Sequence, residues 1–181
     1  MRVLRAADRK PTAWKNGGGT TWEVAASPAG STLDTFGWRM SIAEVATDGA
    51  FSNFPDVDRV LTVIAGNGLE LKLKDTTTMS LGEKSEPFEF PGDASCEAVL
   101  AAGAIRDFNV MTRRGAWSAK VRRATPPDPF QTQADMTLLL ACAPLDLGAL
   151  QLLPEDAVLL EGPATIEFSG GSLIIAELRR L

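Results

Sequence analysis

Apolar and polar residues alternate along many short segments of this chain, and a period of two is typical of β-strands with one buried face. Other segments are short runs rich in β-branched residues, which favour strands buried on both faces. Turn residues separate the segments, so the pattern predicts an all-β sandwich or barrel. A helical turn is the alternative only for residues 146–153. The predicted strands are residues 20–26, 36–45, 60–65, 69–74, 87–93, 97–102, 107–113, 136–143, 150–153, 157–160, 165–168 and 173–178.

Two of the predicted strands carry polar side chains on one face. The first presents Arg39 and Ser41 together, about 7 Å apart at the usual rise per residue, while its opposite face is apolar. The second presents Asp107, Asn109 and Arg113. If these strands close into a barrel, alternate residues point inward, and the polar groups meet inside it.

Three consecutive glycines, Gly17 to Gly19, lie between Trp14 and Trp22. We interpret them as a wide turn into the first strand, and equally as one wall of a site. Glycine allows close approach of the backbone, and the N–H groups of such a loop can bind an anion. Lys15 and Asn16 precede the glycines and join the candidate site on this interpretation.

Two further segments carry residues that interrupt strands. The Asn-Gly pair within residues 66–68 predicts a hairpin between the strands on either side. The prolines of residues 124–129 predict a boundary, because prolines this dense stop regular structure. The predicted division is therefore residues 1–123 and residues 124–181, packed as one compact unit.

The composition of the chain argues against several classes of function. The chain has 181 residues, 45% of them hydrophobic, and a formal net charge of −5. It contains no basic run, which argues against nucleic-acid binding. It contains no apolar run of membrane-helix length and no signal-peptide pattern at its start, so we expect a cytoplasmic protein. Cys96 and Cys142 each lie among apolar residues; buried thiols are expected, and a disulfide is the alternative.

The chain contains no histidine and no tyrosine. Catalysis by Ser-His-Asp or Cys-His groups is therefore excluded, and so is a histidine-based metal site. Because no Asp-rich loop suggests a calcium or magnesium site either, we expect no metal and no other cofactor.

Four motifs together resemble the HutD/Ves family of bacterial proteins. They are WKNGGGT at residues 14–20 with Glu23, WRMSIA at residues 38–43, FSNFP at residues 51–55 with Asp58 and Arg59, and DFNVM at residues 107–111 with Arg113 and Arg114. The resemblance implies a cupin-like double-stranded β-barrel fold, with two barrel halves in one chain (a bicupin), and no metal. It also implies a regulatory role that limits histidine breakdown by sensing an intermediate such as N-formylglutamate, with no firmly attached catalytic activity. The family has one branch encoded with histidine-utilisation enzymes and another that is stress-linked. The four motifs do not show to which branch this chain belongs.

The candidate ligand-binding residues are polar groups that a closed barrel would bring together. Arginine binds a carboxylate through two parallel hydrogen bonds, so these groups suit a small carboxylate ligand. Structural roles are the alternatives: Arg39 would pair with Glu23 or Glu44, and Arg59 with Asp56 or Asp58. The tryptophans are expected in the core rather than around a ligand. The candidates are Arg39, Ser41, Arg59, Asn109, Arg113, Lys15 and Asn16.

The leading hypothesis is thus a metal-free protein that binds a small carboxylate and acts by occupancy. The rival is a metal-independent isomerase or hydrolase of a small organic acid, with Glu23 or Asp107 as the base. A third hypothesis is an interaction protein, which forms a homodimer or holds a partner through surface apolar residues.

Overall fold

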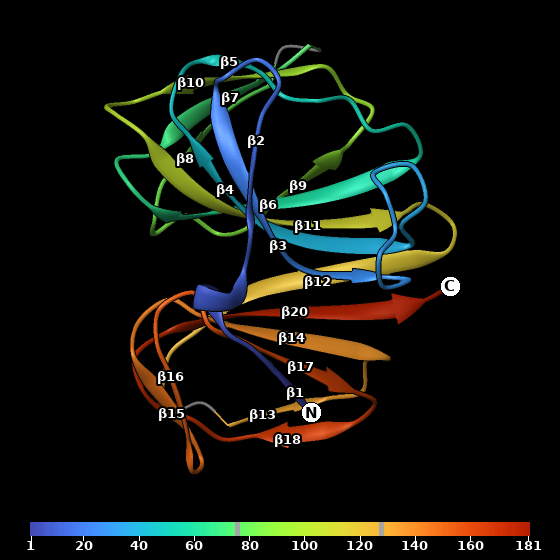
Figure 1. Cartoon of the computed structure of the whole chain (residues 1–181), viewed down its shortest axis with the longest axis vertical. Coiled ribbons are helices and arrows are strands. Elements are labelled where there is room, and N and C mark those ends of the chain that lie inside the picture. Colours follow the sequence, from blue (N-terminus) through green and yellow to red (C-terminus); the bar gives the residue numbers. More distant parts are fainter. Residues whose placement is uncertain (75–76, 127–128) are drawn as a thin grey trace. The chain divides into compact units, whose positions relative to one another are not determined.

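The computed structural model describes residues 1–74, 77–126 and 129–181, and its regular secondary structure is almost entirely β-strand (Figure 1). Within the described residues the helical structure is a single 3-10 turn, Ala6–Asp8. The predicted all-β class is confirmed. None of the described helical structure is long and apolar enough to cross a membrane.

The strands divide into two compact units. We call Lys10–Ala116 the central unit, and Met1–Arg9 together with Trp117–Leu181 the terminal unit. The boundary predicted between residues 123 and 124 instead falls within strand β12 (Trp117–Ala124). Each residue of β12 pairs with β20 (Leu173–Arg180), so backbone hydrogen bonding assigns β12 to the terminal unit. The proline-rich segment proposed as the boundary includes residues 127 and 128, which lie outside the described residues.

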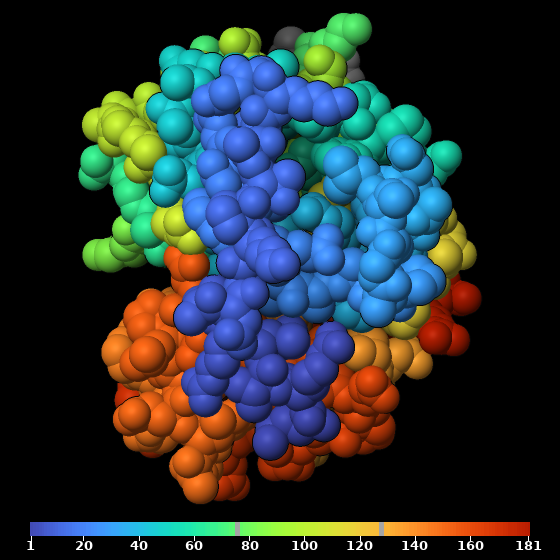
Figure 2. Space-filling model, in the orientation of Figure 1, coloured from blue at the N-terminus to red at the C-terminus, as the bar shows by residue number. Residues whose placement is uncertain are grey.

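The start of the chain belongs to the same unit as its end. Strand β1 (Arg2–Leu4) pairs antiparallel with β17 (Ala157–Glu161). These first residues, dark blue in Figure 2, lie on the visible surface, in keeping with the exposure of Arg2 and Val3. A division of the chain into consecutive halves could not include this return of the N-terminus.

The central unit contains two antiparallel sheets. The six-stranded sheet has the order β2 (Pro11–Ala13), β3 (Gly19–Ser27), β4 (Trp38–Val45), β11 (Ile105–Arg113), β6 (Val57–Ala65) and β9 (Phe88–Pro91). The four-stranded sheet has the order β5 (Gly49–Ala50), β10 (Cys96–Leu100), β7 (Leu69–Leu73) and β8 (Thr78–Leu81).

Strand β4 is buried on both of its faces. Trp38, Met40 and Ile42 are at most 2% exposed, and Ser41 and Ala43 on the other face are buried as well. The polar face of β4 is therefore inside the protein.

Strand β3 also departs from simple alternation. Glu23 lies opposite Ser41 of β4, but Ala25 lies opposite Met40, so Val24 is the extra residue of a β-bulge. The bulge reverses the faces of the residues after it, so strict alternation of faces does not hold through residues 20–26.

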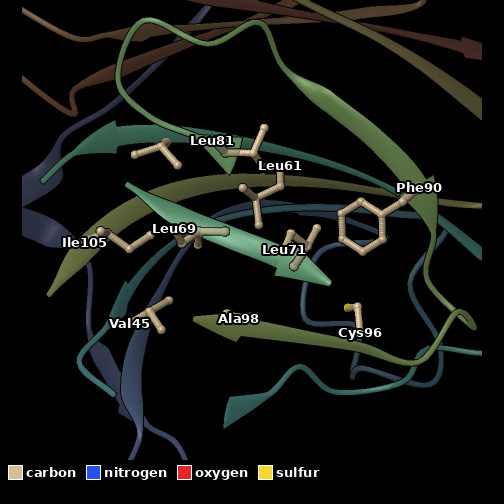
Figure 3. Packing of buried hydrophobic residues seen from close by; sticks show 10 residues of the cluster. Val45, Leu61, Leu69, Leu71, Leu81, Phe90, Cys96, Ala98 and Ile105 are labelled. Carbon is tan, nitrogen blue, oxygen red and sulfur yellow. The ribbon is translucent and has the colours of Figure 1, made fainter. Parts of the chain in front are cut away.

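The core of the central unit lies between its two sheets. Side chains from both sheets point toward one another in a close-packed cluster (Figure 3). A smaller cluster of Phe36, Val57 and Met111 packs against Phe54. Burial of such side chains contributes roughly 1.5–3 kcal/mol each. The larger cluster contains Val45, Leu61, Val63, Leu69, Leu71, Leu81, Phe90, Cys96, Ala98 and Ile105.

The turn at residues 66–68 passes between sheets rather than closing a hairpin. Strand β6 before it pairs with β11 and β9, whereas β7 after it pairs with β10 and β8. Gly66 and Gly68 both have positive φ, at 96° and 91°, and backbone atoms of neighbouring segments leave no room for a Cβ at either position. The Asn-Gly signal correctly marked a turn, but the hairpin prediction was wrong.

The terminal unit contains three antiparallel sheets and its own apolar core. Residues 145–152 form two strands, so the alternative of a helical turn there was wrong. Cys96 and Cys142 are both free, which confirms the interpretation as thiols; Cys96 is buried as expected, whereas Cys142 is half-buried. The sheets have the orders β1-β17-β14 (Met136–Ala141)-β20-β12, β13 (Phe130–Thr132)-β18 (Ala164–Ile166), and β16 (Leu150–Leu152)-β15 (Leu145–Leu147)-β19 (Ser169–Gly170).

Candidate functional site

The strand register of the six-stranded sheet brings four of the predicted residues onto one face. Strand β11 lies between β4 and β6. Asn109 of β11 lies opposite Ser41 of β4, and Met111 lies opposite both Arg39 of β4 and Arg59 of β6. Residues directly opposite in antiparallel strands share a face, so these side chains form one group inside the central unit.

Arg59 is the centre of this group. Its side chain is buried, with 6% of the residue exposed, and its Nη2 donates a 2.7 Å hydrogen bond to Oδ1 of Asn109. The guanidinium carbon lies 5.4, 5.5 and 5.0 Å from the ring centres of Phe51, Phe54 and Phe90. Neither Asp56 nor Asp58, the partners considered as structural alternatives, pairs with Arg59 among the described contacts.

The positive charge of Arg59 lies in the protein interior, where it loses the solvation that water would provide. Burial lowers the pKa of Arg59; Cys96 and Asp107 act against this effect, and the nearby Arg39 adds to it. The Nε atom is buried and has no hydrogen-bond partner among the described residues. A buried guanidinium with an unused donor is a group that an anion would stabilise.

Asn109 links Arg59 to a buried carboxyl group. Its Nδ2 donates a short hydrogen bond to Oδ1 of Asp107. Asp107 is 1% exposed, and its Oδ2 has no partner among the described residues. Burial raises the pKa of Asp107 to about 7, with Arg59 and Arg106 acting in the opposite direction. The carboxyl group is therefore poised to titrate near neutral pH.

Arg39 lies in the same group of side chains as Arg59, and it forms an ion pair with Glu23. Its Nε donates to Glu23 at 3.0 Å, and its Nη1 donates to Oγ of Ser41 at 3.3 Å. Glu44, the other partner considered, pairs with Arg106 at 3.5 Å. The Arg39 side chain is 13% exposed, and that of Glu23 is 46% exposed, so this pair lies nearer to solvent than Arg59.

Arg113 holds two loops. It donates to the carbonyl oxygens of Pro55 at 3.0 Å and Asp34 at 3.2 Å, and its guanidinium lies over the ring of Phe36. These contacts direct it to the loops rather than to the group around Arg59. A role of Arg113 in ligand binding stays a prediction.

Lys15 and Asn16 lie in the exposed turn before the glycines. Oδ1 of Asn16 accepts a hydrogen bond from the backbone N–H of Gly18, so Asn16 closes the turn locally. Ligand binding by Lys15 and Asn16 also stays a prediction. Trp38 is a core residue, whereas Trp14 and Trp22 are half-buried.

Sequence reasoning missed the three rings around Arg59. Phe51 and Phe54 come from the loop between β5 and β6, and Phe90 comes from β9. The register explains Phe90, because it lies directly opposite Arg59. The FSNFP motif was the available signal for the other two rings, but the pairing of β6 with β9 could not be seen in the sequence.

Comparison with known proteins identifies the family. A model of the HutD family matches residues 6–176. The chain belongs to the HutD family. The predicted resemblance to HutD/Ves proteins is thereby confirmed.

Individual HutD relatives support this assignment. An uncharacterised 21.2 kDa protein from the hutC 3′ region of Pseudomonas putida is 34% identical over 149 residues, which cover 79% of this chain and 74% of that protein. Protein Ves of Citrobacter koseri is 43% identical over 112 residues, which cover 61% of this chain and 57% of Ves. The solved structure of HutD from Pseudomonas fluorescens SBW25 has a TM-score of 0.90 at 32% identity, and the match covers 99% of this chain and 98% of that one. The all-β fold is cupin-like, as in its structural neighbours.

Proposed function

We propose that this HutD-family protein binds a small carboxylate at Arg59 and acts through occupancy of that site. The observation that carries the proposal is the buried guanidinium of Arg59, which has no ion pair among the described residues and an unpartnered Nε. Burial of an unpaired charge costs several kcal/mol, and a bound carboxylate would offset much of that cost. Asp107 acts electrostatically on Arg59, but the amide of Asn109 lies between the two in the hydrogen-bond chain.

The neighbouring groups suit a carboxylate. Arg39 supplies a second cation on the same face, and Ser41 supplies a hydroxyl beside it. Guanidinium groups bind carboxylates through parallel hydrogen bonds. The proposed ligand-binding set is therefore Arg59, Asn109, Arg39 and Ser41.

The proposed biological role is regulation of histidine utilisation in the cytoplasm, with N-formylglutamate as the candidate signal. Family membership and the relative from the hutC 3′ region support this role. We further propose that each unit is one half of a bicupin. The separate sheets and separate apolar cores of the two units support that proposal.

Calorimetric titration with N-formyl-L-glutamate, urocanate and glutamate tests the proposal. The wild-type protein is expected to bind at least one of these anions. Arg59→Met retains much of the side-chain volume but removes the charge, and it is expected to weaken binding by roughly 30-fold or more, from the 2–5 kcal/mol typical of a truncated buried charge pair. Arg122→Met is the matched control, because Arg122 also lies over a phenyl ring, that of Phe130 in the terminal unit. No binding of any of the three anions, or equal binding by Arg59→Met, would overturn the proposal.

A second candidate function is favoured by Asp107. Its buried Oδ2 is unpartnered, and its pKa of about 7 is suited to a general base at neutral pH. Glu23, the other base considered, is paired with Arg39 and half exposed. Incubation with the same three anions, followed by NMR, separates the two functions. New resonances that Asp107→Asn abolishes would establish an isomerase or hydrolase, and unchanged spectra favour binding alone.

A further inference from the structure

The loop between β5 and β6 forms part of the surroundings of Arg59. We call residues 51–56 the aromatic loop. It carries Phe51 and Phe54, whose rings lie 5.4 and 5.5 Å from the guanidinium carbon of Arg59. The position of this loop therefore determines how Arg59 is enclosed.

The aromatic loop has no strand pairing along most of its length and is held by individual contacts. The backbone N–H groups of Phe51 and Phe54 donate to the carbonyls of Cys96 and Gly92. The side chain of Asn53 donates to the carbonyl of Asp93. Both hydrogen bonds to Gly92 and Asp93 depend on the turn after β9.

Arg114 connects the end of the aromatic loop to that same turn. Its backbone N–H donates to the carbonyl of Asp56 at 2.8 Å, and its Nη2 donates to the carbonyl of Val57 at 3.3 Å. Its Nε and Nη2 both donate to Oδ1 of Asp58, at 3.0 and 2.9 Å. Its Nη1 and Nη2 reach the two carboxylate oxygens of Asp93, at 3.0 and 3.2 Å.

The contacts of Arg114 shift its own pKa and that of Asp93. The hydrogen bonds to Asp93 first, and to Asp58 next, raise the pKa of Arg114, and the hydrogen bond from Arg114 lowers the pKa of Asp93. The Arg114 side chain is 41% exposed, and ion pairs this exposed contribute little to global stability. Its main effect should therefore be local, on the segments that it joins.

We propose that Arg114 is a positioning residue for the Arg59 site: it bridges Asp58 and Asp93 and thereby holds Phe51 and Phe54 in place around Arg59. This inference rests on the proposed function of Arg59 as an anion site. Loss of Arg114 lets the aromatic loop leave its binding-competent position, and apparent affinity falls by the fraction of molecules that keep it.

The variants are Arg114→Ala, which removes the bridge, and Arg114→Lys, which keeps the charge but cannot pair both carboxylates through two nitrogens each. Arg180→Ala is the matched control, because Arg180 is exposed and lies over a ring, that of Trp117, in the terminal unit. Two measurements are made on each protein. The first is amide hydrogen exchange at Phe51 and Phe54, and the second is calorimetric titration with N-formyl-L-glutamate, urocanate and glutamate.

The expected result for Arg114→Ala is faster exchange at both amides, affinity reduced about 3- to 10-fold, and little change in the midpoint of thermal unfolding. Arg114→Lys should fall between the wild type and Arg114→Ala. Unchanged exchange overturns the inference, and so does faster exchange with wild-type affinity. If the wild-type protein binds none of the anions, the proposed function fails and this inference fails with it, whereas normal wild-type binding with unchanged Arg114→Ala affinity refutes the inference alone.

Discussion

Arg59 and Asp107 are charged residues in positions where a charge is costly. Both are at least 94% buried by exposed area, and Asn109 lies between them as donor to one and acceptor from the other. Each also retains one buried polar atom without a partner among the described residues. Buried polar groups are normally satisfied, so such exceptions concentrate at functional sites.

The titration of Asp107 should make stability depend on pH. Its pKa in the folded protein, about 7, lies above the ordinary value of 3.8, so the folded state holds the proton more tightly. The contribution of Asp107 to the unfolding free energy should therefore be largest below about pH 4 and fall as pH rises to about 7, by up to about 1.4 kcal/mol per pH unit. Above that range the contribution of Asp107 is constant.

Urea unfolding of the wild type and Asp107→Asn between pH 4.5 and pH 8 tests this dependence. Asparagine cannot ionise, so the profile of the variant should be flatter. Asp8→Asn is the control, because Asp8 is exposed. Parallel profiles for the wild type and Asp107→Asn would show that Asp107 does not titrate in this range.

At the scale of elements, the glycine that begins β3 serves packing. The backbone of Gly19 lies so close to β4 that a Cβ would collide with the carbonyl oxygen of Glu44 and lie 3.1 Å from the ring of Trp14. Trp14 in turn donates from Nε1 to Oγ1 of Thr21 at 2.7 Å and packs edge-on against Phe51. Gly19 thus allows the ring of Trp14 and the backbone of β4 to approach closely.

Gly19→Ala should destabilise the protein by about 1–3 kcal/mol, because the backbone of β4 cannot move away from the added methyl group. Gly82→Ala is the matched control, since no atom lies within 4 Å of a Cβ placed there. Chemical unfolding of both variants measures the difference. Equal stability of the two variants would mean that the turn adapts to the added methyl group.

At the scale of the whole molecule, the two ends of the chain complete one unit. Asp156, which is 4% exposed, accepts hydrogen bonds from the side chain of Arg5 and from the backbone N–H groups of Ala6 and Leu153. Burial opposes ionisation of Asp156, but these hydrogen bonds outweigh it and lower its pKa. The first residues are thus attached to the terminal unit by a buried carboxylate as well as by β1.

Asp156→Asn should lower the unfolding free energy at pH 7 by about 1–3 kcal/mol, as expected for weakened hydrogen bonds to a buried charged group. Because the folded pKa is depressed, the stabilisation by Asp156 is present above its ordinary pKa and is lost as pH falls below about 4. The two proteins should therefore converge in acid. Asp146→Asn, at an exposed position, is the control, and a constant difference at every pH would contradict this account.

Much of the fold could be predicted from local pattern, as could part of the candidate site. Alternation placed Arg39 with Ser41, and Asn109 with Asp107, because residues two apart on a strand share a face whatever the strand pairs with. Three features could not be predicted, because each depends on partners distant in the sequence. They are the bulge at Val24, the passage between sheets at residues 66–68 and the pairing of β1 with β17.

The sequence by itself determined the all-β class, the family and the absence of histidine chemistry, since these follow from residue types and their local spacing. Only the tertiary structure decided which polar residues meet. The order β4-β11-β6-β9 brings Arg59 to Asn109 and Phe90, whereas Arg113, on the same face of β11, is directed to loops. The physical reason is that burial, register and desolvation are properties of neighbours in space, and strand pairing joins residues as far apart in the chain as Arg59 and Asn109.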